Sequence, residues 1–221
     1  MRRRWRALAI VPVAAMMVTG TVFAQEGTPA PSDTENPRLV APEECVGEPR
    51  SYEEIAGILM LDGEGVPAPA MTQITPPLGE ITTPEIDLNI NEAAREVLAC
   101  FNAGDIPRAA GLMTDNGVRR AYWGLTIDEE NRALARERIP AAPEPRAAEA
   151  LVRLITVTDV STLPDGRVAA FVVLNEPLLP PTGPETLLFI FADQDGRWLV
   201  DDWIDFSIVP ADFGVLATPA P

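Results

Sequence analysis

The sequence contains neither histidine nor lysine, so all of its 17 basic residues are arginines, against 33 acidic residues. Without histidine there is no Ser-His-Asp triad and no imidazole ligand for zinc. Without lysine there is no Schiff base and no P-loop. The side chains left for chemistry are carboxylates, tyrosine, arginine and thiol. We therefore expect no metal site and no cofactor.

The first 24 residues have the pattern of a targeting segment. Arginines at positions 2, 3, 4 and 6 precede an apolar stretch from Ala7 to about Val18, and a small residue, Ala24, ends the segment. This pattern predicts a signal peptide cleaved near Ala24, because a membrane-spanning helix needs about 20 apolar residues. An uncleaved anchor is the alternative. We expect a secreted or extracytoplasmic protein of the cell envelope, with no stable membrane insertion after cleavage.

The chain is strongly acidic. Its formal net charge is −16, and removal of the four leader arginines takes it to −20. A surface of this charge repels phosphate backbones and anionic lipids. We therefore expect neither nucleic acid nor an anionic membrane as a partner.

Cysteine is scarce, and its two occurrences are Cys45 and Cys100. No histidine can activate Cys100 as a nucleophile, and its place near the end of a predicted helix disfavours a thiolate. Thiols of exported proteins tend to pair, and two cysteines allow one intramolecular pairing. The sequence predicts a disulfide between Cys45 and Cys100, with two separate thiols as the alternative.

Composition divides the chain into five segments. The signal peptide, 1–24, is followed by a polar, proline-bearing segment, 25–50, which we predict to be a flexible tether. Residues 51–87 hold a short helix opened by a capping box at Ser51 and a Pro-rich connector predicted to wrap the domain. The main domain is assigned to 88–208. A disordered tail is expected at 209–221.

Helical patterns fill the first half of the main domain. Asn89 is the predicted cap of a helix with one apolar stripe, which Gly104 ends. Asp105 is expected to cap a second helix, closed by the sequence TDNG. Thr126 is expected to cap a polar third helix that runs through DEENRALARER.

From about residue 150 the pattern changes to β-branched and apolar segments. Four of them are separated by turn sequences: LVRLITVTDVSTL, RVAAFVVLNE, ETLLFIFADQ and RWLVDDWIDFSIV. Helices followed by strands indicate an α+β fold, with the helices packed on one face of a curved antiparallel four-stranded sheet. Asp193 and Asp195 are interpreted as hairpin-turn residues, because the segment lacks the other oxygen ligands of a calcium loop.

Two stretches resemble the nuclear transport factor 2-like superfamily, which includes polyketide cyclase and ketosteroid isomerase relatives. They are the helix pair around CFNAGDIPRAAGLMTDNG and the closing hairpin LLFIFADQDGRWLVDDW. The resemblance covers about residues 88–208 and implies a cone-like fold with an apolar pocket at its open end. Members of the superfamily include isomerases, cyclases, dehydratases and modules that only bind or dimerise. No shared catalytic motif is matched here, so no catalytic residue is carried over.

Five residues are candidates for lining a ligand pocket: Arg120, Tyr122, Trp123, Trp198 and Asp202. The first three follow the helix pair, where the resemblance places the pocket rim, although core aromatics with solvated arginines are the ordinary alternative.

Strict alternation along the last strand puts Asp202 on the same face as Trp198, where burial would raise its pKa and make it a general base. An edge carboxylate bound by Arg119 or Arg120 is the other interpretation, and we prefer it.

Several functions are compatible with the sequence. The leading hypothesis is an exported, non-enzymatic module that binds a small hydrophobic ligand or a protein, with a homodimer through the outer sheet face as one arrangement. The missing catalytic motif and the disulfide motivate it. The alternative is an acid/base isomerase or dehydratase that uses Asp202 as base and Tyr122 as hydrogen-bond donor. A third hypothesis is a structural accessory of a cell-surface assembly.

Overall fold

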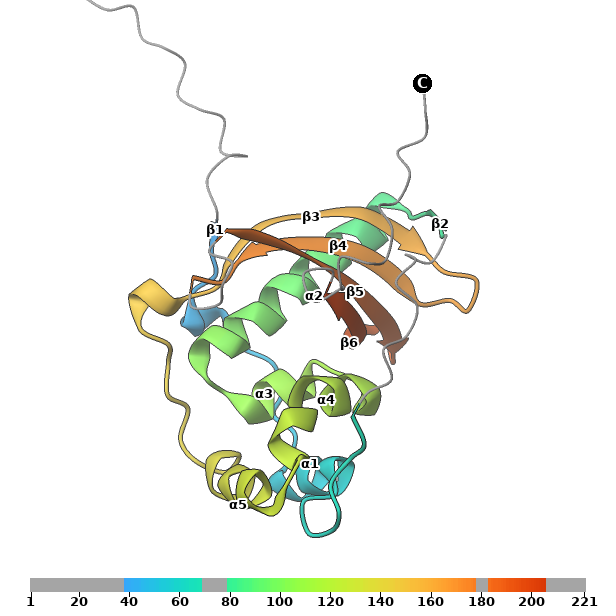
Figure 1. The fold of residues 1–221 in the computed structure, drawn as a ribbon. Helices are drawn as coiled ribbons and strands as arrows, with labels where there is room; N and C mark the ends of the chain where they lie inside the picture. The colour runs from blue at the N-terminus through green and yellow to red at the C-terminus, as the bar shows by residue number, and fades with distance from the viewer. Residues whose placement is uncertain (1–37, 69–78, 178–182, 206–221) are drawn as a thin grey trace, which may run out of the picture. The chain divides into compact units, whose positions relative to one another are not determined.

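The computed structural model of the chain describes residues 38–68, 79–177 and 183–205. The predicted signal peptide and C-terminal tail, the first half of the predicted tether and the middle of the Pro-rich connector lie outside these ranges. Within them, helices come first and an antiparallel sheet follows, as Figure 1 shows. The predicted α+β class is confirmed.

Five α-helices precede the long strands. Their bounds are Tyr52–Leu59 for α1, Pro84–Ala103 for α2, Ile106–Gly111 for α3, Asp115–Tyr122 for α4 and Glu129–Arg138 for α5. The capping box at Ser51 and the cap at Asp105 are confirmed, because both side chains accept a backbone N–H of the first turn. In each case a short polar side chain satisfies a donor that the helix cannot.

The helix α2 starts earlier than predicted. Thr83, rather than Asn89, is its cap, and the Thr83 hydroxyl accepts a hydrogen bond from the backbone N–H of Ile86 at 3.3 Å. Pro84 follows in the first turn, where its missing N–H has no cost. The predicted domain boundary at 88 therefore falls inside a helix.

Two further cap predictions were wrong. Thr114 does not end α3 but begins α4, since its hydroxyl accepts from Gly117 N at 3.1 Å. Asp128, not Thr126, caps α5 by accepting from Asn131 N at 2.8 Å. Thr126 is buried and donates to the backbone of the preceding turn. Several cap-forming residues compete in these stretches, and packing decides among them.

The sheet is an antiparallel meander with short additions at one edge. The long strands are β3 (Arg153–Thr162), β4 (Val168–Asn175), β5 (Pro184–Gln194) and β6 (Arg197–Asp205). Two short strands, β1 (Arg38–Leu39) and β2 (Glu80–Ile81), both pair with β3. The described part of the sheet therefore has six strands, and the prediction of four was wrong because a two-residue strand has no detectable periodicity.

A β-bulge changes the facing of residues on β6. Phe191 lies opposite Val200, but the preceding Ile190 lies opposite Asp202, so Asp201 is an extra residue. Beyond the bulge the inward and outward positions are exchanged. The predicted alternation is therefore wrong after Val200: Trp203 lies opposite Phe189 on the inner face, and Asp202 lies on the outer face.

The inner face of the sheet packs on α2, over which strands β3 to β6 arch in Figure 1. The main core combines the apolar stripe of α2 with alternate residues of the strands, among them Val97, Leu98, Phe191 and Val200. This burial fixes the register of the strands, since a one-residue slip would turn their apolar side chains outward.

Residues 38–50 are part of the folded domain rather than a flexible tether. The predicted disulfide between Cys45 and Cys100 is present, and Val40 is fully buried. Arg95 on α2 forms an ion pair with Glu44, with Nε to Oε2 at 2.5 Å. The tether prediction was wrong here because a polar, proline-bearing composition does not reveal such specific links.

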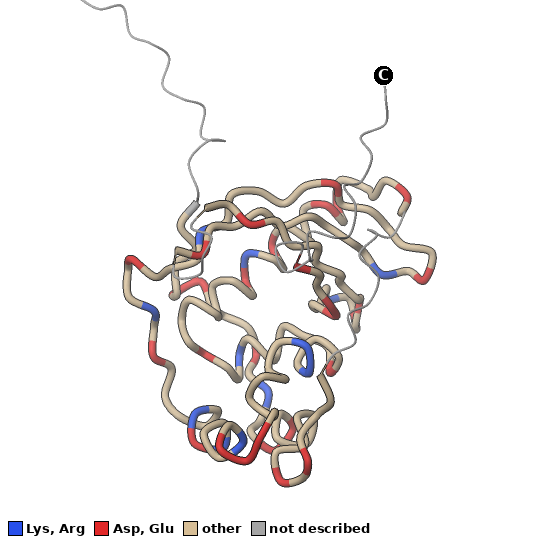
Figure 2. Tube along the Cα trace, viewed as in Figure 1, with Lys and Arg blue, Asp and Glu red and all other residues tan. Residues whose placement is uncertain are grey.

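Charged residues of both signs are distributed over the helices and the sheet in Figure 2, and the sequence has 33 acidic residues against 17 arginines. In the described ranges, no helix is long and apolar enough to cross a membrane.

Candidate functional site

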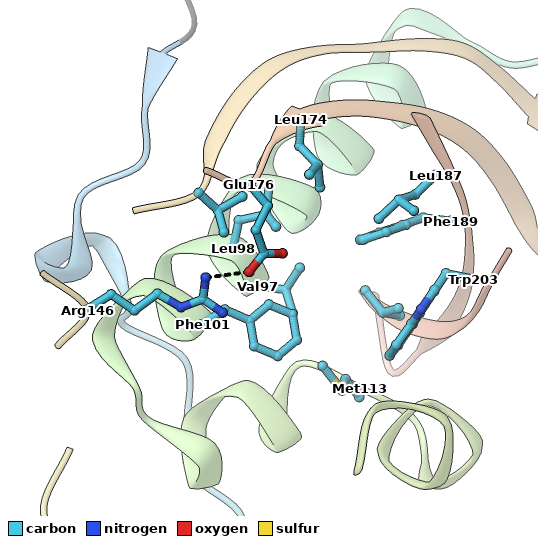
Figure 3. Close-up of a pocket in the computed structure, with 12 residues that line it drawn as sticks. Val97, Leu98, Phe101, Met113, Arg146, Leu174, Glu176, Leu187, Phe189 and Trp203 are labelled. Atoms are coloured by element: carbon cyan, nitrogen blue, oxygen red, sulfur yellow. Dashed lines mark hydrogen bonds and ion pairs between the residues drawn. The ribbon is translucent and has the colours of Figure 1, made fainter. Parts of the chain in front are cut away.

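An apolar cavity of about 130 Å³ lies between the C-terminal half of α2 and the inner face of the sheet (Figure 3). We call it the inner cavity. Ten apolar side chains line it: Val97, Leu98, Phe101, Met113, Val152, Leu174, Leu187, Phe189, Val200 and Trp203. Such walls suit an apolar group of about the size of benzene, which fills a comparable cavity of about 150 Å³.

Three elements bring these side chains together. The stripe of α2 supplies Val97 and Phe101, which lie one turn apart on the same helix face. Alternation on β5 supplies Phe189, and the bulge on β6 turns Trp203 inward beside it. The ring centroids of Phe189 and Trp203 are 6.1 Å apart, within the range of an aromatic pair.

An ion pair borders the inner cavity. Arg146, in the loop after α5, donates from Nη1 to Oε1 of Glu176 at 2.7 Å, as the dashed line in Figure 3 marks. The backbone N–H of Arg146 also donates to the carbonyl of Asn102, so the loop is held against α2. The cavity thus has apolar walls and a polar rim, the usual composition of a small-molecule site.

Two further carboxylates, Glu185 and Asp205, lie near the rim residue Glu176. Glu185 lies opposite Leu174, and Asp205 lies opposite Leu187, so both carboxylates share a sheet face with cavity-lining residues. Burial, followed by the charges of Asp205 and then Glu176, raises the pKa of Glu185. At the position of Glu185, burial and these two neighbouring carboxylates therefore disfavour a negative charge.

Asp202 does not line the inner cavity. Its Oδ1 lies 3.3 Å from Nε of Arg120, and Arg120 also donates from Nη2 to the carbonyl of Trp203 at 3.1 Å. The interpretation of Asp202 as an edge carboxylate bound by Arg120 is confirmed. The general-base interpretation placed Asp202 on the inner face, and the bulge removes that placement.

The bulge itself is held by side-chain contacts. The Thr114 hydroxyl donates to Asp201 Oδ1 at 2.6 Å, and Arg167 donates from Nη1 to Asp201 Oδ2 at 2.8 Å. These partners come from the start of α4 and from the hairpin before β4. The extra residue is thereby fixed, and with it the inward position of Trp203.

The remaining sequence candidates lie in different places. Trp123 follows α4 and is 37% exposed. Trp198 packs partly against the core and lines a shallow recess with Leu112 and Arg197. In the β5–β6 hairpin, Oδ1 of Asp193 accepts from the backbone N–H of Gly196 at 2.8 Å, which confirms a turn role for that carboxylate.

A larger groove, of about 810 Å³, lies beyond the rim of the inner cavity. We call it the outer groove. It is bordered by the corner between α2 and α3, by Tyr122, and by the segment 138–147. Phe101, Arg146 and Glu176 line both spaces, so the inner cavity and the outer groove are neighbours with a common wall.

The segment 138–147 is held close to the helix corner. Gly104 has a φ of +65°, and a Cβ there would lie 2.2 Å from the carbonyl oxygen of Glu144. A glycine is therefore required both by the left-handed backbone and by the close approach. This contact positions one wall of the outer groove.

Among the five residues predicted from the sequence to line a pocket, Tyr122 lines the outer groove. Its hydroxyl is buried and has no hydrogen-bond partner, the one such side-chain atom among the described residues. Burial, with a smaller contribution from the Asp105 carboxylate, raises the pKa of this hydroxyl. The phenol is therefore a protonated donor at neutral pH.

Sequence reasoning missed the rim residues and most of the cavity wall. Arg146 lies in a proline-rich stretch without periodicity, and Glu176 follows a strand as an ordinary polar residue would. The inward position of Trp203 depends on the bulge, for which the sequence gives no signal. The apolar stripe of α2, which carries Val97 and Phe101, was predicted.

Comparisons with protein-family models, with curated proteins and with solved structures found no significant match to this chain.

Proposed function

We propose that the protein is an exported binding module whose inner cavity takes a small apolar molecule without transforming it. The observation that carries this proposal is the 130 Å³ cavity with its apolar walls and charged rim. The disulfide between Cys45 and Cys100 is consistent with an extracytoplasmic location. A cone-like fold of the nuclear transport factor 2-like superfamily, and a homodimer through the outer sheet face, remain parts of the proposal.

The rim defines which head group the ligand carries. Arg146 is already paired with Glu176, and the charges of Asp205 and Glu176 act on the neighbouring Glu185, whose pKa they raise. These carboxylates would repel an anionic ligand in this partly desolvated place, whereas they would not repel a neutral or cationic ligand. The ligand class is therefore a small apolar molecule with a neutral or cationic end.

The acid/base alternative has less support. Asp202 is bound to Arg120 and lies outside the lining of the inner cavity and of the outer groove, whereas Tyr122 lines the groove. The proposed base and donor thus do not face a common described cavity. A general base must come within hydrogen-bond reach of the proton it removes.

Three probes with the same ring test the proposal: benzylamine, benzyl alcohol and benzoate, which differ in head-group charge. We expect the first two to bind and benzoate to bind at least tenfold more weakly, as measured by calorimetry and by shifts in NMR spectra. Equal affinity for all three would contradict the role of the rim.

A variant that fills the cavity provides the structural control. Val97→Phe adds volume on the cavity side of α2 and should abolish binding while the protein stays folded, since filling a void adds contacts. If this buried position does not accept phenylalanine, Leu187→Phe fills the same space from the less buried β5 side. Probe binding that survives a folded, filled variant would refute the proposal.

A further inference from the structure

A residue that lines the outer groove, Tyr122, carries a buried donor that the fold leaves unused. Nearly all buried polar atoms in proteins have a hydrogen-bond partner, and an exception calls for an explanation. In the described part of the chain, the Tyr122 hydroxyl is that exception. Tyr122 lines the groove together with the α3 residues Ile106 and Ala109.

The surroundings of this hydroxyl define the acceptor that fits. Asp105 is near enough for its charge to affect Tyr122, but its carboxylate already binds Arg108, with Oδ2 at 3.1 Å from Nη1, and caps α3. A negatively charged acceptor would be repelled by Asp105. A neutral carbonyl oxygen accepts the phenol hydrogen bond without that repulsion.

The groove has the volume and the lining for a whole small molecule. Its volume of about 810 Å³ is within the range of typical ligand sites, roughly 300–1,000 Å³. Its wall alternates apolar side chains, such as Phe101 and Ile106, with charges of both signs, such as Arg138 and Glu144. Such a lining favours an uncharged molecule with apolar and polar parts.

We infer that the outer groove is a second binding site, for an uncharged carbonyl compound such as a ketone, ester or amide, to which the Tyr122 hydroxyl donates a hydrogen bond. The hydroxyl is shielded from water in the ligand-free protein, so the ligand reaches it by displacing part of the groove wall. Arg138, an exposed side chain at the end of α5, lines that wall. A hydrogen bond formed there gains strength from the low local polarity.

The site is tested with a fluorescent ketone, 6-propionyl-2-(dimethylamino)naphthalene, whose emission depends on polarity and on hydrogen bonding to its carbonyl. This probe is more than twice the size of benzene and therefore too large for the inner cavity. We expect the wild-type protein to bind it, and to bind the carbonyl-free analogue 2-(dimethylamino)naphthalene roughly fivefold to tenfold more weakly. Equal affinity for the two dyes would overturn the inference.

Tyr122→Phe removes the donor alone. The variant should keep or exceed the wild-type melting temperature, because no partner is lost, and should bind the ketone roughly fivefold to tenfold more weakly. Tyr52→Phe, the same change at the other tyrosine of the chain, should leave dye binding unchanged. A destabilised Tyr122→Phe protein with undiminished preference for the ketone would show a structural hydroxyl and refute the proposal.

The two proposed sites are distinguished by crossing probes and variants. Val97→Phe should abolish benzylamine binding and leave ketone-dye binding intact, whereas Tyr122→Phe should do the opposite. Loss of both probes in one folded variant would contradict the separation of the two sites.

Discussion

The C-terminal half of α2 has two differently occupied sides. Toward residues 38–50, Cys100 is covalently linked to Cys45, and the Asn102 side chain donates a hydrogen bond to the carbonyl of Val40. The same amide also makes two hydrogen bonds to the backbone of Val152, just before β3, and so ties the helix to the start of the sheet. Toward the sheet and the segment 138–147, Val97 and Phe101 border open space. One side of the helix thus supplies stability, and this allows the other side to leave space for a ligand.

The largest expected effect comes from removing the covalent link. The double variant Cys45→Ser, Cys100→Ser should lose about 4 kcal/mol of unfolding free energy, because the disulfide closes a loop with a sequence separation of 55. Urea denaturation measures the loss. Dithiothreitol should destabilise the wild type by a similar amount and leave the variant unchanged. A loss below about 1 kcal/mol would show that the anchored side does not depend on the link.

The second largest effect is expected at Asn102. Asn102→Ala leaves the carbonyl of Val40 and both backbone groups of Val152 without their buried partner, which should cost about 3 kcal/mol. Asn91→Ala on the same helix removes an exposed hydrogen bond to Asp87 and is the matched control, expected within about 0.5 kcal/mol of the wild type. If the two variants lost similar amounts of unfolding free energy, the buried hydrogen bonds of Asn102 would contribute no more to stability than the exposed one of Asn91.

The smallest effect is expected at Glu185, on the side of the inner cavity, and it is a gain of stability rather than a loss. The folded protein raises the pKa of Glu185 above the ordinary value of 4.5, so stability falls as the pH rises from that value through the raised one. Glu185→Gln removes this loss and should be more stable at pH 7 by about 0.5 kcal/mol, with no gain at pH 3.

Thermal unfolding at both pH values checks the Glu185 prediction, with Glu149→Gln at an exposed position as the control. A gain of equal size at pH 3 would show that charge at the cavity rim is not the cause.

The main helices and strands could be predicted because their signals lie within short stretches of sequence. The disulfide could be predicted because two cysteines allow one pairing. Two cysteines in a chain that is predicted to be exported have one partner each, and the periodicity of the α2 stripe and of the strands follows from helix and strand geometry. The Ser51 and Asp105 caps depend on atoms within one turn. The confirmed pairing of Asp202 with Arg120 needed only a choice between neighbouring arginines.

The sequence by itself therefore determined the fold class, the long strands, the covalent link and the apolar face of α2. The tertiary structure decided the site, because Asp201 lies in a bulge where Thr114 and Arg167, from distant parts of the chain, bind its carboxylate. That extra residue exchanges the faces of Asp202 and Trp203 and so decides which side chain borders the inner cavity. Long-range contacts of this kind have no period in the sequence, and strict alternation therefore placed Asp202 on the wrong face even though its pairing with a neighbouring arginine was predicted.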